Sequence, residues 1–206
     1  MKGKIHLVRH GKVENPKGVI YGRLPGYHLS ELGKQQAQAA ADRLAQADIG
    51  AVWSSPLERA QETAEMIAAP HSLSIITDER LLESGTSLEG IGRTLASFLT
   101  SPRHWWHLRN PFKPSWGESF SEIRARMLEV VAEALQEADG REVVVVSHQT
   151  PVQVARLALA RRNVPPWLGF APCVTGSVST LELDEGRVLS ASYFAPSMSS
   201  SAGSTG

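Results

Sequence analysis

The chain has 206 residues, of which 42% are hydrophobic and 20% charged, a composition typical of a globular domain. Lys and Arg number 21, as do Asp and Glu, which excludes a global positive field that would attract nucleic acid or an anionic membrane. No apolar stretch approaches the roughly 20 residues needed to cross a bilayer. The N-terminal apolar run is too short for a signal-peptide core, so we expect a cytoplasmic protein. The single cysteine, Cys173, excludes an intrachain disulfide and argues against a cysteine-based zinc site.

The first predicted element is a short buried strand over residues 4–8, which leads directly into Arg9, His10 and Gly11. The following segment as far as Leu29 is rich in Gly and Pro, which predicts a long loop, and loops of this length are usually functional. Ser30 is then predicted to cap a helix that continues to about Leu44, because Ala and Leu recur there with helical spacing.

Strands and helices alternate through the rest of the chain. Further strands are predicted at 51–54, 74–77, 143–146, 178–183 and 188–193, and further helices at 56–69, 87–99, from Ser119 or Ser121 to about 138, and 150–162. This alternation indicates βαβ units and a mainly parallel sheet covered on both faces. We therefore predict an α/β fold, a three-layer α/β/α sandwich with a mixed, mostly parallel central sheet.

One domain over residues 1–196 is expected to contain the whole sheet, followed by a disordered Ser/Gly-rich tail over 197–206. Residues 102–117, which include Trp105, Trp106 and Trp116, interrupt the pattern and are too short for a separate core. They are interpreted as a cap-like insertion that contacts a substrate through apolar and stacking contacts. Packing of these Trp residues onto the domain, or a homodimer interface, are equal alternatives.

Two histidines occupy matching positions in the predicted sheet. His10 follows the strand 4–8, and His148 follows the run of four valines that ends at Val146 and Ser147. In open α/β sheets, ligands bind at the carboxyl edge of the strands. Arg9, Arg59 and Glu83 also follow predicted strands, so these five side chains can converge at one edge.

That set of side chains has a definite chemical capacity. Two guanidiniums supply forks of donors for phosphate oxygens, one imidazole can act as a nucleophile, and a carboxylic acid can protonate a leaving oxygen. Such a pocket transfers a phosphoryl group without a metal or other cofactor. Taken singly, each residue would have an ordinary explanation, and His10, His148 and Glu83 could also form a zinc site. Two arginines beside a cation argue against zinc.

The ordered motifs resemble those of the histidine phosphatase superfamily, also called the phosphoglycerate mutase-like family, over roughly residues 4–160. They are Leu7-Val8-Arg9-His10-Gly11, Leu29-Ser30-Glu31-Leu32-Gly33 with Gln36-Ala37, the run Ser54 to Ala64 around Arg59, Leu82-Glu83 with Leu88-Glu89-Gly90, Gly117-Glu118-Ser119, and Val145-Val146-Ser147-His148.

The resemblance implies a role for each of the five residues. His10 would attack phosphorus and become phosphohistidine, while Arg9, Arg59 and His148 would surround the phosphoryl oxygens. Glu83 would protonate the leaving group and then activate the water that hydrolyses the intermediate.

Several positions depart from the family pattern. Lys12-Val13 replace the usual pair after Arg-His-Gly, Asn15 lies one position from the usual phosphate-binding Asn, and Gln149 replaces a Gly. Asn15, Arg23 and Gln149 are candidate substrate-binding residues. None of these departures removes one of the five core groups, so we predict an active enzyme.

The resemblance and the chain length favour a phosphatase that acts on a small phosphorylated metabolite. Phosphoglycerate mutase-type transfer is the first alternative. It is less favoured because family mutases resemble longer chains with an extra insertion and additional basic residues, and this chain is short. A non-catalytic phospho-ligand binding module is the second, although a binder needs no leaving-group acid.

Overall fold

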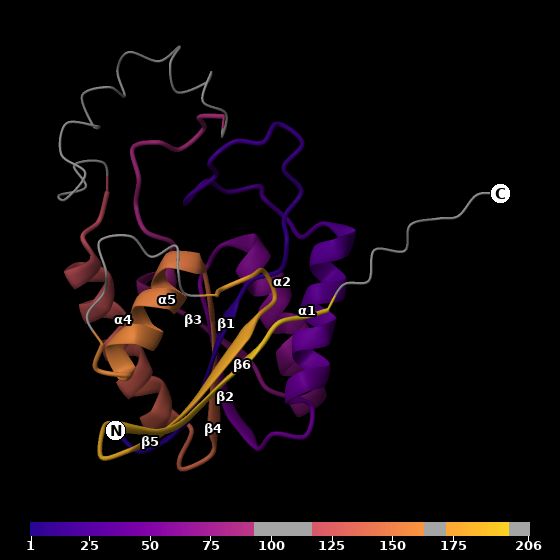
Figure 1. Ribbon diagram of the computed structural model, residues 1–206. Helices are drawn as coiled ribbons and strands as arrows, with labels where there is room; N and C mark the ends of the chain where they lie inside the picture. Colours follow the sequence, from indigo (N-terminus) through magenta and orange to yellow (C-terminus); the bar gives the residue numbers. More distant parts are fainter. Residues whose placement is uncertain (93–116, 163–171, 198–206) are drawn as a thin grey trace.

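The computed structural model describes residues 1–92, 117–162 and 172–197. It contains one six-stranded sheet in the order β3-β2-β4-β1-β5-β6 (Figure 1). The strands are β1 (Gly3–Arg9), β2 (Ile49–Ser54), β3 (Ile75–Thr77), β4 (Glu142–Ser147), β5 (Val178–Asp184) and β6 (Arg187–Phe194). Strands β1, β2, β3 and β4 pair in parallel, whereas β5 pairs antiparallel with both β1 and β6. The prediction of a mixed, mostly parallel sheet is confirmed.

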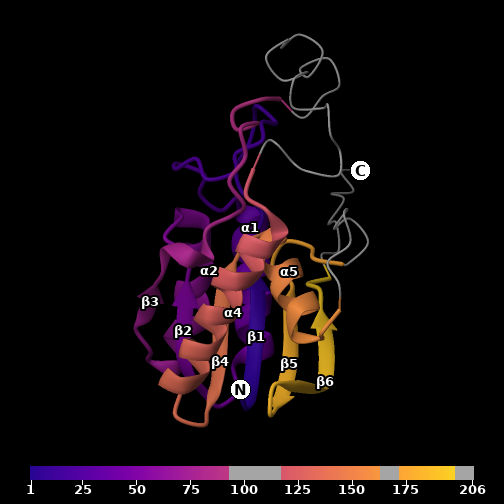
Figure 2. The same cartoon turned by 90° about the vertical axis from the view of Figure 1, so that its left-hand side faces the viewer.

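In the described part of the chain, helices cover both faces of the sheet (Figures 1 and 2). Helices α1 (Glu31–Leu44) and α2 (Glu58–Ala68) lie on one face, and α4 (Phe120–Glu137) and α5 (Gln149–Leu159) lie on the other. Because side chains alternate across a strand, Val143 and Val145 join the core beneath α4 and α5 while Val144 and Val146 join the core beneath α1 and α2. The four-valine run is buried for this reason.

Local capping signals start two of these helices where the sequence predicts. The Ser30 hydroxyl accepts a hydrogen bond from the Gly33 N–H at the start of α1. Ser119, rather than Ser121, caps α4 and forms a reciprocal capping box with Glu122. These caps fix the first turn of α1 and of α4.

The central pair of strands sets the position of the two histidines. Arg9 of β1 lies beside Ser147 of β4 in register, and the His10 N–H donates to the Ser147 carbonyl at 3.0 Å. His10 and His148, which follow these strands, therefore emerge as neighbours at the carboxyl edge. In both views the loop that follows β1 projects beyond this edge (Figures 1 and 2).

Two sequence predictions about helices need correction. The helix predicted over 87–99 does not begin there, because residues 87–90 form a turn with a positive φ of 81° at Gly90, and Gly92 makes a β-bridge with Val19. Residues 93–99 of that prediction lie outside the described residues. Pro56 does not lie in the first turn of α2, which begins at Glu58 after Leu57 as N-cap. Short 3₁₀ helices at Ala69–His71 and Glu79–Leu81 were also not predicted.

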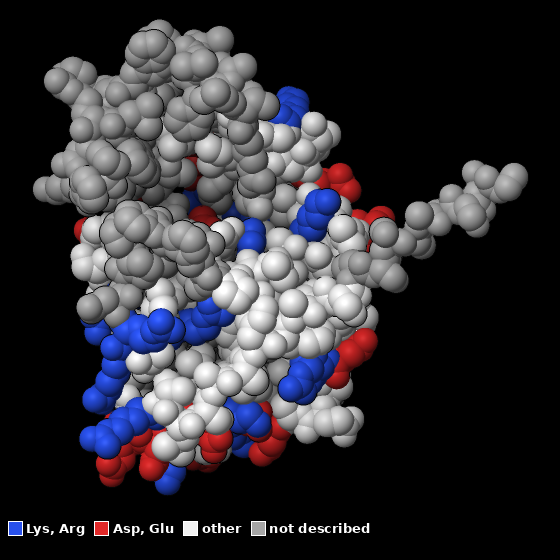
Figure 3. Space-filling view, viewed as in Figure 1, with Lys and Arg blue, Asp and Glu red and all other residues white. Residues whose placement is uncertain are grey.

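The predictions for the Trp-rich insertion 102–117 and for the C-terminal tail fall almost wholly on residues outside the described ranges. On the face drawn in Figure 3, Lys and Arg side chains and Asp and Glu side chains are both present, in keeping with the balanced composition. Among the residues that the structure describes, no helix is long and apolar enough to span a membrane.

Candidate active site

His10 and His148 form the centre of the candidate site. Their ring centroids lie 5.1 Å apart, and the two rings meet edge to face at 62°. His10 is 2% exposed and His148 is fully buried. Adjacent strands bring together two imidazoles that are separated by more than 130 positions in the chain, as the sequence predicted.

The hydrogen bonding of His10 leaves one ring nitrogen available for chemistry. Nδ1 lies 2.7 Å from the Gly11 carbonyl oxygen, which can only accept, so Nδ1 carries the proton. In the neutral ring Nε2 then holds a lone pair. Burial, with the charges of Arg59 and Arg9, lowers the pKa of His10 to about 3, so the neutral form predominates at physiological pH.

His148 is oriented by Ser55, which follows β2. The Ser55 hydroxyl lies 2.8 Å from Nε2 of His148 and accepts from the Leu57 N–H at 3.5 Å, so its own proton is free to be donated to Nε2. The ring proton of neutral His148 is then on Nδ1. Burial and the proximity of His10 lower the pKa of His148, which supports the neutral form.

Arg59 is fully buried in the first turn of α2. One of its terminal nitrogens donates to the Gly22 carbonyl at 2.6 Å, the other donates to Leu24 at 3.5 Å, and the guanidinium lies 4.9 Å from the Tyr21 ring centroid. Arg9, at the end of β1, donates from Nη1 to the Cys173 carbonyl at 2.6 Å. Carbonyl oxygens therefore hold both guanidiniums, and the ring face of Tyr21 also contacts Arg59.

Three of the predicted phosphate-binding side chains share an unusual property. Nε of Arg9, Nε of Arg59 and Nδ1 of His148 are each buried and have no hydrogen-bond partner among the described residues. A buried donor without a partner is costly, and a bound ion or ligand is one explanation for such a group. Two permanent positive charges accompany these donors, so the ligand they suit is an anion.

Glu83 shares a pocket of about 170 Å³ with His10 and Arg9. Its Oε1 accepts hydrogen bonds from the Ser84 N–H at 2.8 Å and from the Ser84 hydroxyl at 3.4 Å. Tyr21 and Gln149 also line this pocket, so Gln149 lies where the sequence placed a substrate contact.

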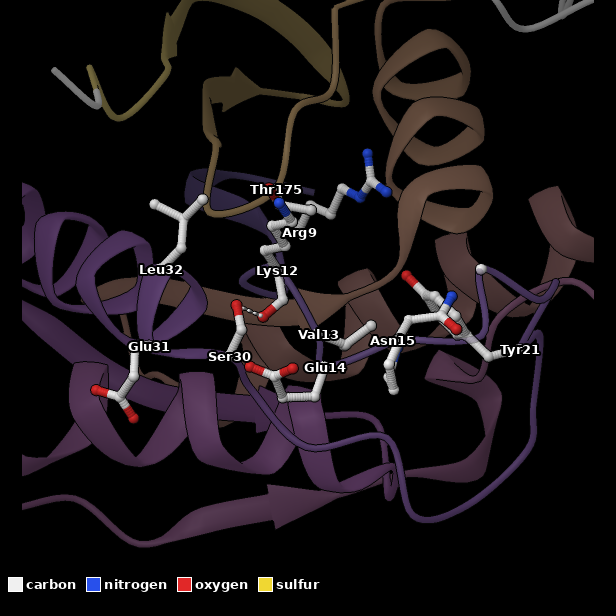
Figure 4. Close-up of a pocket in the computed structure, with 12 residues that line it drawn as sticks. Arg9, Lys12, Val13, Glu14, Asn15, Tyr21, Ser30, Glu31, Leu32 and Thr175 are labelled. Carbon is white, nitrogen blue, oxygen red and sulfur yellow. Dashed lines mark hydrogen bonds between the residues drawn. The ribbon is translucent and has the colours of Figure 1, made fainter. Parts of the chain in front are cut away.

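A larger neighbouring pocket of about 680 Å³ shares Arg9 and Tyr21 with the first (Figure 4). Its walls come from the segment after β1, the start of α1 and the Thr175 loop. Lys12 and Asn15 line this pocket rather than the one that contains His10. Asn15 also closes a local turn, because its amide donates to the Val19 carbonyl at 2.9 Å and accepts from the Val19 N–H at 3.1 Å.

Arg23, the third predicted substrate contact, lies beside the main chain of the Glu83 segment. Its Nε donates to the Glu83 carbonyl at 2.7 Å, and its Nη2 lies 2.9 Å from the Glu118 carboxylate. The structure thus brings Arg9, His10, Glu83 and Gln149 into one pocket. His148 is in ring contact with His10, and the Arg59 charge acts on His10. Asn15 lies in the neighbouring pocket and Arg23 at the main chain of Glu83.

Close backbone packing holds His10 in place. A Cβ at Gly11 would lie 2.3 Å from the Gly33 carbonyl oxygen, and a Cβ at Gly33 would lie 1.9 Å from that of Lys12, so neither glycine can be enlarged without moving the chain. The Gly11 N–H also donates to the buried Thr63 hydroxyl at 3.1 Å. The loop after β1 is thereby anchored to both α1 and α2.

Sequence reasoning did not assign a role to Ser55, Tyr21 or Thr63. Ser55 stands next to the predicted strand end at Ser54, which was an available signal, and Tyr21 lies in the long loop that the Gly and Pro content marked as functional. Thr63 is on α2, and nothing in the local pattern distinguishes it from a core position.

Within the described residues, no group of three or more His, Cys, Asp or Glu side chains could hold a metal ion, so the zinc alternative has no cluster there.

Comparisons with known proteins identify the family of the chain. The model of the histidine phosphatase superfamily (branch 1) matches residues 5–195. A Mycobacterium tuberculosis protein described as uncharacterized is 48% identical over 195 residues, which cover 94% of this chain and 96% of the relative. The chain therefore belongs to the histidine phosphatase superfamily, as the motifs predicted.

Relatives with functional names include both phosphatases and a mutase. Phosphoserine phosphatase 1 of Hydrogenobacter thermophilus is 30% identical and the 2,3-bisphosphoglycerate-dependent phosphoglycerate mutase of Thermoplasma acidophilum is 28% identical, each with 89% of this chain and 88% of the relative covered. A solved mycobacterial glucosyl-3-phosphoglycerate phosphatase in complex with VO3 has a TM-score of 0.71 at 29% identity, with 87% of this chain and 92% of the other covered. These names indicate phosphoryl transfer as the common chemistry.

Proposed function

We propose that the chain is a phosphomonoesterase that hydrolyses a small phosphorylated metabolite through a phosphohistidine at His10, without a metal ion. The observation that carries this proposal is the pairing of an unprotonated Nε2 on His10 with three buried, unpartnered N–H donors on Arg9, Arg59 and His148. Those donors suit the charge that spreads over a phosphoryl group in transfer, which is the role a metal ion has in other phosphoryl-transfer enzymes.

In the first step Nε2 of His10 attacks phosphorus, and the bond from phosphorus to the leaving oxygen breaks. The protonated Glu83 carboxyl gives its proton to that oxygen, so a neutral alcohol departs. The location of Glu83 in the same pocket as His10 supports this role.

In the second step the Glu83 carboxylate takes a proton from water as the water oxygen attacks the phosphohistidine. The bond between phosphorus and nitrogen breaks, inorganic phosphate leaves, and His10 and Glu83 return to their starting protonation states.

Hydrolysis in the presence of a chelator tests the proposal directly. With excess EDTA, we expect the protein to release phosphate from p-nitrophenyl phosphate and from at least one alkyl phosphate at the rate seen without EDTA. Loss of activity in EDTA, with recovery on addition of Mg²⁺ or Zn²⁺, would contradict the metal-independent mechanism. A panel of phosphomonoesters then identifies the substrate whose kcat/KM stands above the rest.

The phosphoglycerate mutase relative supports a second candidate function, transfer between two positions of one substrate. Conversion of 3-phosphoglycerate to its 2-isomer, measured beside phosphate release from the same compound, separates the two. Isomerisation faster than phosphate release would replace the phosphatase assignment with a mutase assignment, and both share the phosphohistidine step.

A further inference from the structure

Glu118 connects two arginines just before helix α4 begins. Its Oε1 accepts from Nε of Arg126 at 2.7 Å, and its Oε2 accepts from Nη2 of Arg126 at 2.9 Å, which makes a two-point carboxylate–guanidinium pair. Oε2 also accepts from Nη2 of Arg23 at 2.9 Å. The Glu118 and Arg126 side chains are only 18% and 14% exposed, so solvent screens this pair weakly.

Both arginines continue from Glu118 to the main chain around Glu83. Nε of Arg23 donates to the Glu83 carbonyl at 2.7 Å, and Nη1 of Arg126 donates to the Arg80 carbonyl. One carboxylate therefore links two cations whose remaining donors hold the chain at Glu83 and at a residue shortly before it. This arrangement is a bridge between α4, the loop after β1 and the segment that carries the acid.

The backbone of Glu118 adds a third attachment to the same segment. Its N–H donates to the Gly85 carbonyl at 3.2 Å, and Gly117 makes a β-bridge with Thr86. A Cβ at Gly117 would lie 2.2 Å from the Gly85 carbonyl oxygen, so the close approach requires a glycine there. The start of α4 thus touches the Glu83 segment on both sides of the acid.

The Glu83 side chain makes its own hydrogen bonds to Ser84, its neighbour in the chain. Because these hydrogen bonds join two neighbouring residues, they move with the segment and cannot fix its position relative to His10. The position of the Glu83 carboxyl in the pocket consequently depends on what holds the main chain of residues 80–86.

We propose that Glu118 is a positioning residue for the general acid, holding Glu83 through Arg23 and Arg126 at the distance needed to protonate the leaving oxygen. This inference rests on the proposed function, because Glu83 acts as a general acid only if the chain transfers phosphoryl groups to His10. Glu118 itself touches neither the substrate nor the reacting atoms.

Leaving-group dependence separates positioning of an acid from general support of the fold. An alkyl phosphate releases a poor leaving group and needs the proton, whereas p-nitrophenyl phosphate releases a stabilised phenolate and needs little help. The comparison uses kcat/KM, which reports only the steps up to departure of the alcohol, because hydrolysis of the phosphohistidine is common to both substrates. For Glu118→Gln we expect kcat/KM on the best alkyl phosphate to fall by about 10²-fold, the scale of a general acid contribution, while kcat/KM on p-nitrophenyl phosphate changes only a few-fold.

Glu142→Gln is the matched control. Glu142 is 20% exposed and also links two basic side chains, Lys4 at 3.0 Å and His6 at 2.7 Å, but it lies at the opposite edge of the sheet. This variant should keep the wild-type ratio of the two kcat/KM values even if its thermal stability falls. Arg23→Lys, which keeps the positive charge but loses the fork, should repeat the Glu118→Gln pattern and serves if Glu118→Gln fails to fold.

An equal fall in kcat/KM on both substrates, or no fall on either, would overturn the positioning role. The same would follow if Glu142→Gln changed the ratio as much as Glu118→Gln. Failure of the underlying function gives a different result, since the His10→Asn protein would then hydrolyse both esters as fast as the wild type.

Discussion

The His10→Asn protein is expected to lose at least about 10³-fold in kcat for every phosphomonoester that the wild type hydrolyses. Asparagine preserves a donor near the Gly11 carbonyl that Nδ1 of His10 contacts at 2.7 Å, but it has no nucleophilic nitrogen in the place of Nε2. The loss should therefore fall on kcat, with KM changed little, because Arg9, Arg59 and His148 remain to bind the phosphoryl group. Steady-state kinetics on p-nitrophenyl phosphate and one alkyl phosphate measure both constants.

His71→Asn is a suitable control for that variant. His71 lies in the 3₁₀ helix after α2, at the end of the helix away from Arg59, and contributes nothing to either pocket. Its kinetic constants should match those of the wild type. Activity in His10→Asn within a few-fold of the wild type would show that His10 is not the nucleophile.

Replacement of Arg59 should give the second-largest loss. Arg59→Ala is expected to lower kcat/KM by about 10²–10³-fold, the cost of removing one preorganised charged donor from a transition state. The Gly22 and Leu24 carbonyls accept hydrogen bonds from the Arg59 guanidinium and would lose this donor. The free energy of unfolding should therefore fall by about 1–3 kcal/mol. Denaturant unfolding measures that second effect separately from kinetics.

The pH profile distinguishes the Arg59 charge from its hydrogen bonds. Burial is the main cause of the low His10 pKa of about 3, and the Arg59 charge is the next. Loss of that charge raises the pKa of His10. On acidification, the activity of Arg59→Ala should therefore begin to fall at a higher pH than that of the wild type. Arg59→Lys keeps the charge, and its acid limb should stay close to that of the wild type while kcat/KM remains low. An unchanged acid limb in Arg59→Ala would contradict an electrostatic role at His10.

Local signals were sufficient for the centre of the fold and of the site. The four valines of β4 and the apolar run of β1 could be identified as buried strands, and the rule that ligands bind at the carboxyl edge then placed His10 and His148 together. The start of α1 could also be predicted from Ser30, because capping depends on a few adjacent residues.

Contacts between distant segments determined what the sequence did not predict. A helix was expected from residue 87, yet Gly90 adopts a positive φ and Gly92 pairs with Val19, a partner that no local pattern indicates. Arg23 was expected at the substrate, but a basic residue in a loop gives no sign that its Nε will donate to the Glu83 carbonyl. Ser55 and Thr63 likewise matter only because the fold brings them to His148 and Gly11.

The most direct test of the central claim is to trap the phosphorylated protein. Glu83→Gln cannot activate water, so with p-nitrophenyl phosphate the first step should outpace the second. We predict a rapid burst of p-nitrophenol stoichiometric with protein, followed by slow turnover. Mass spectrometry of an alkaline-quenched digest should find one phosphoryl group on the peptide that contains His10. Turnover without a burst and without phosphorylated His10, or phosphate on a different residue, would contradict the mechanism.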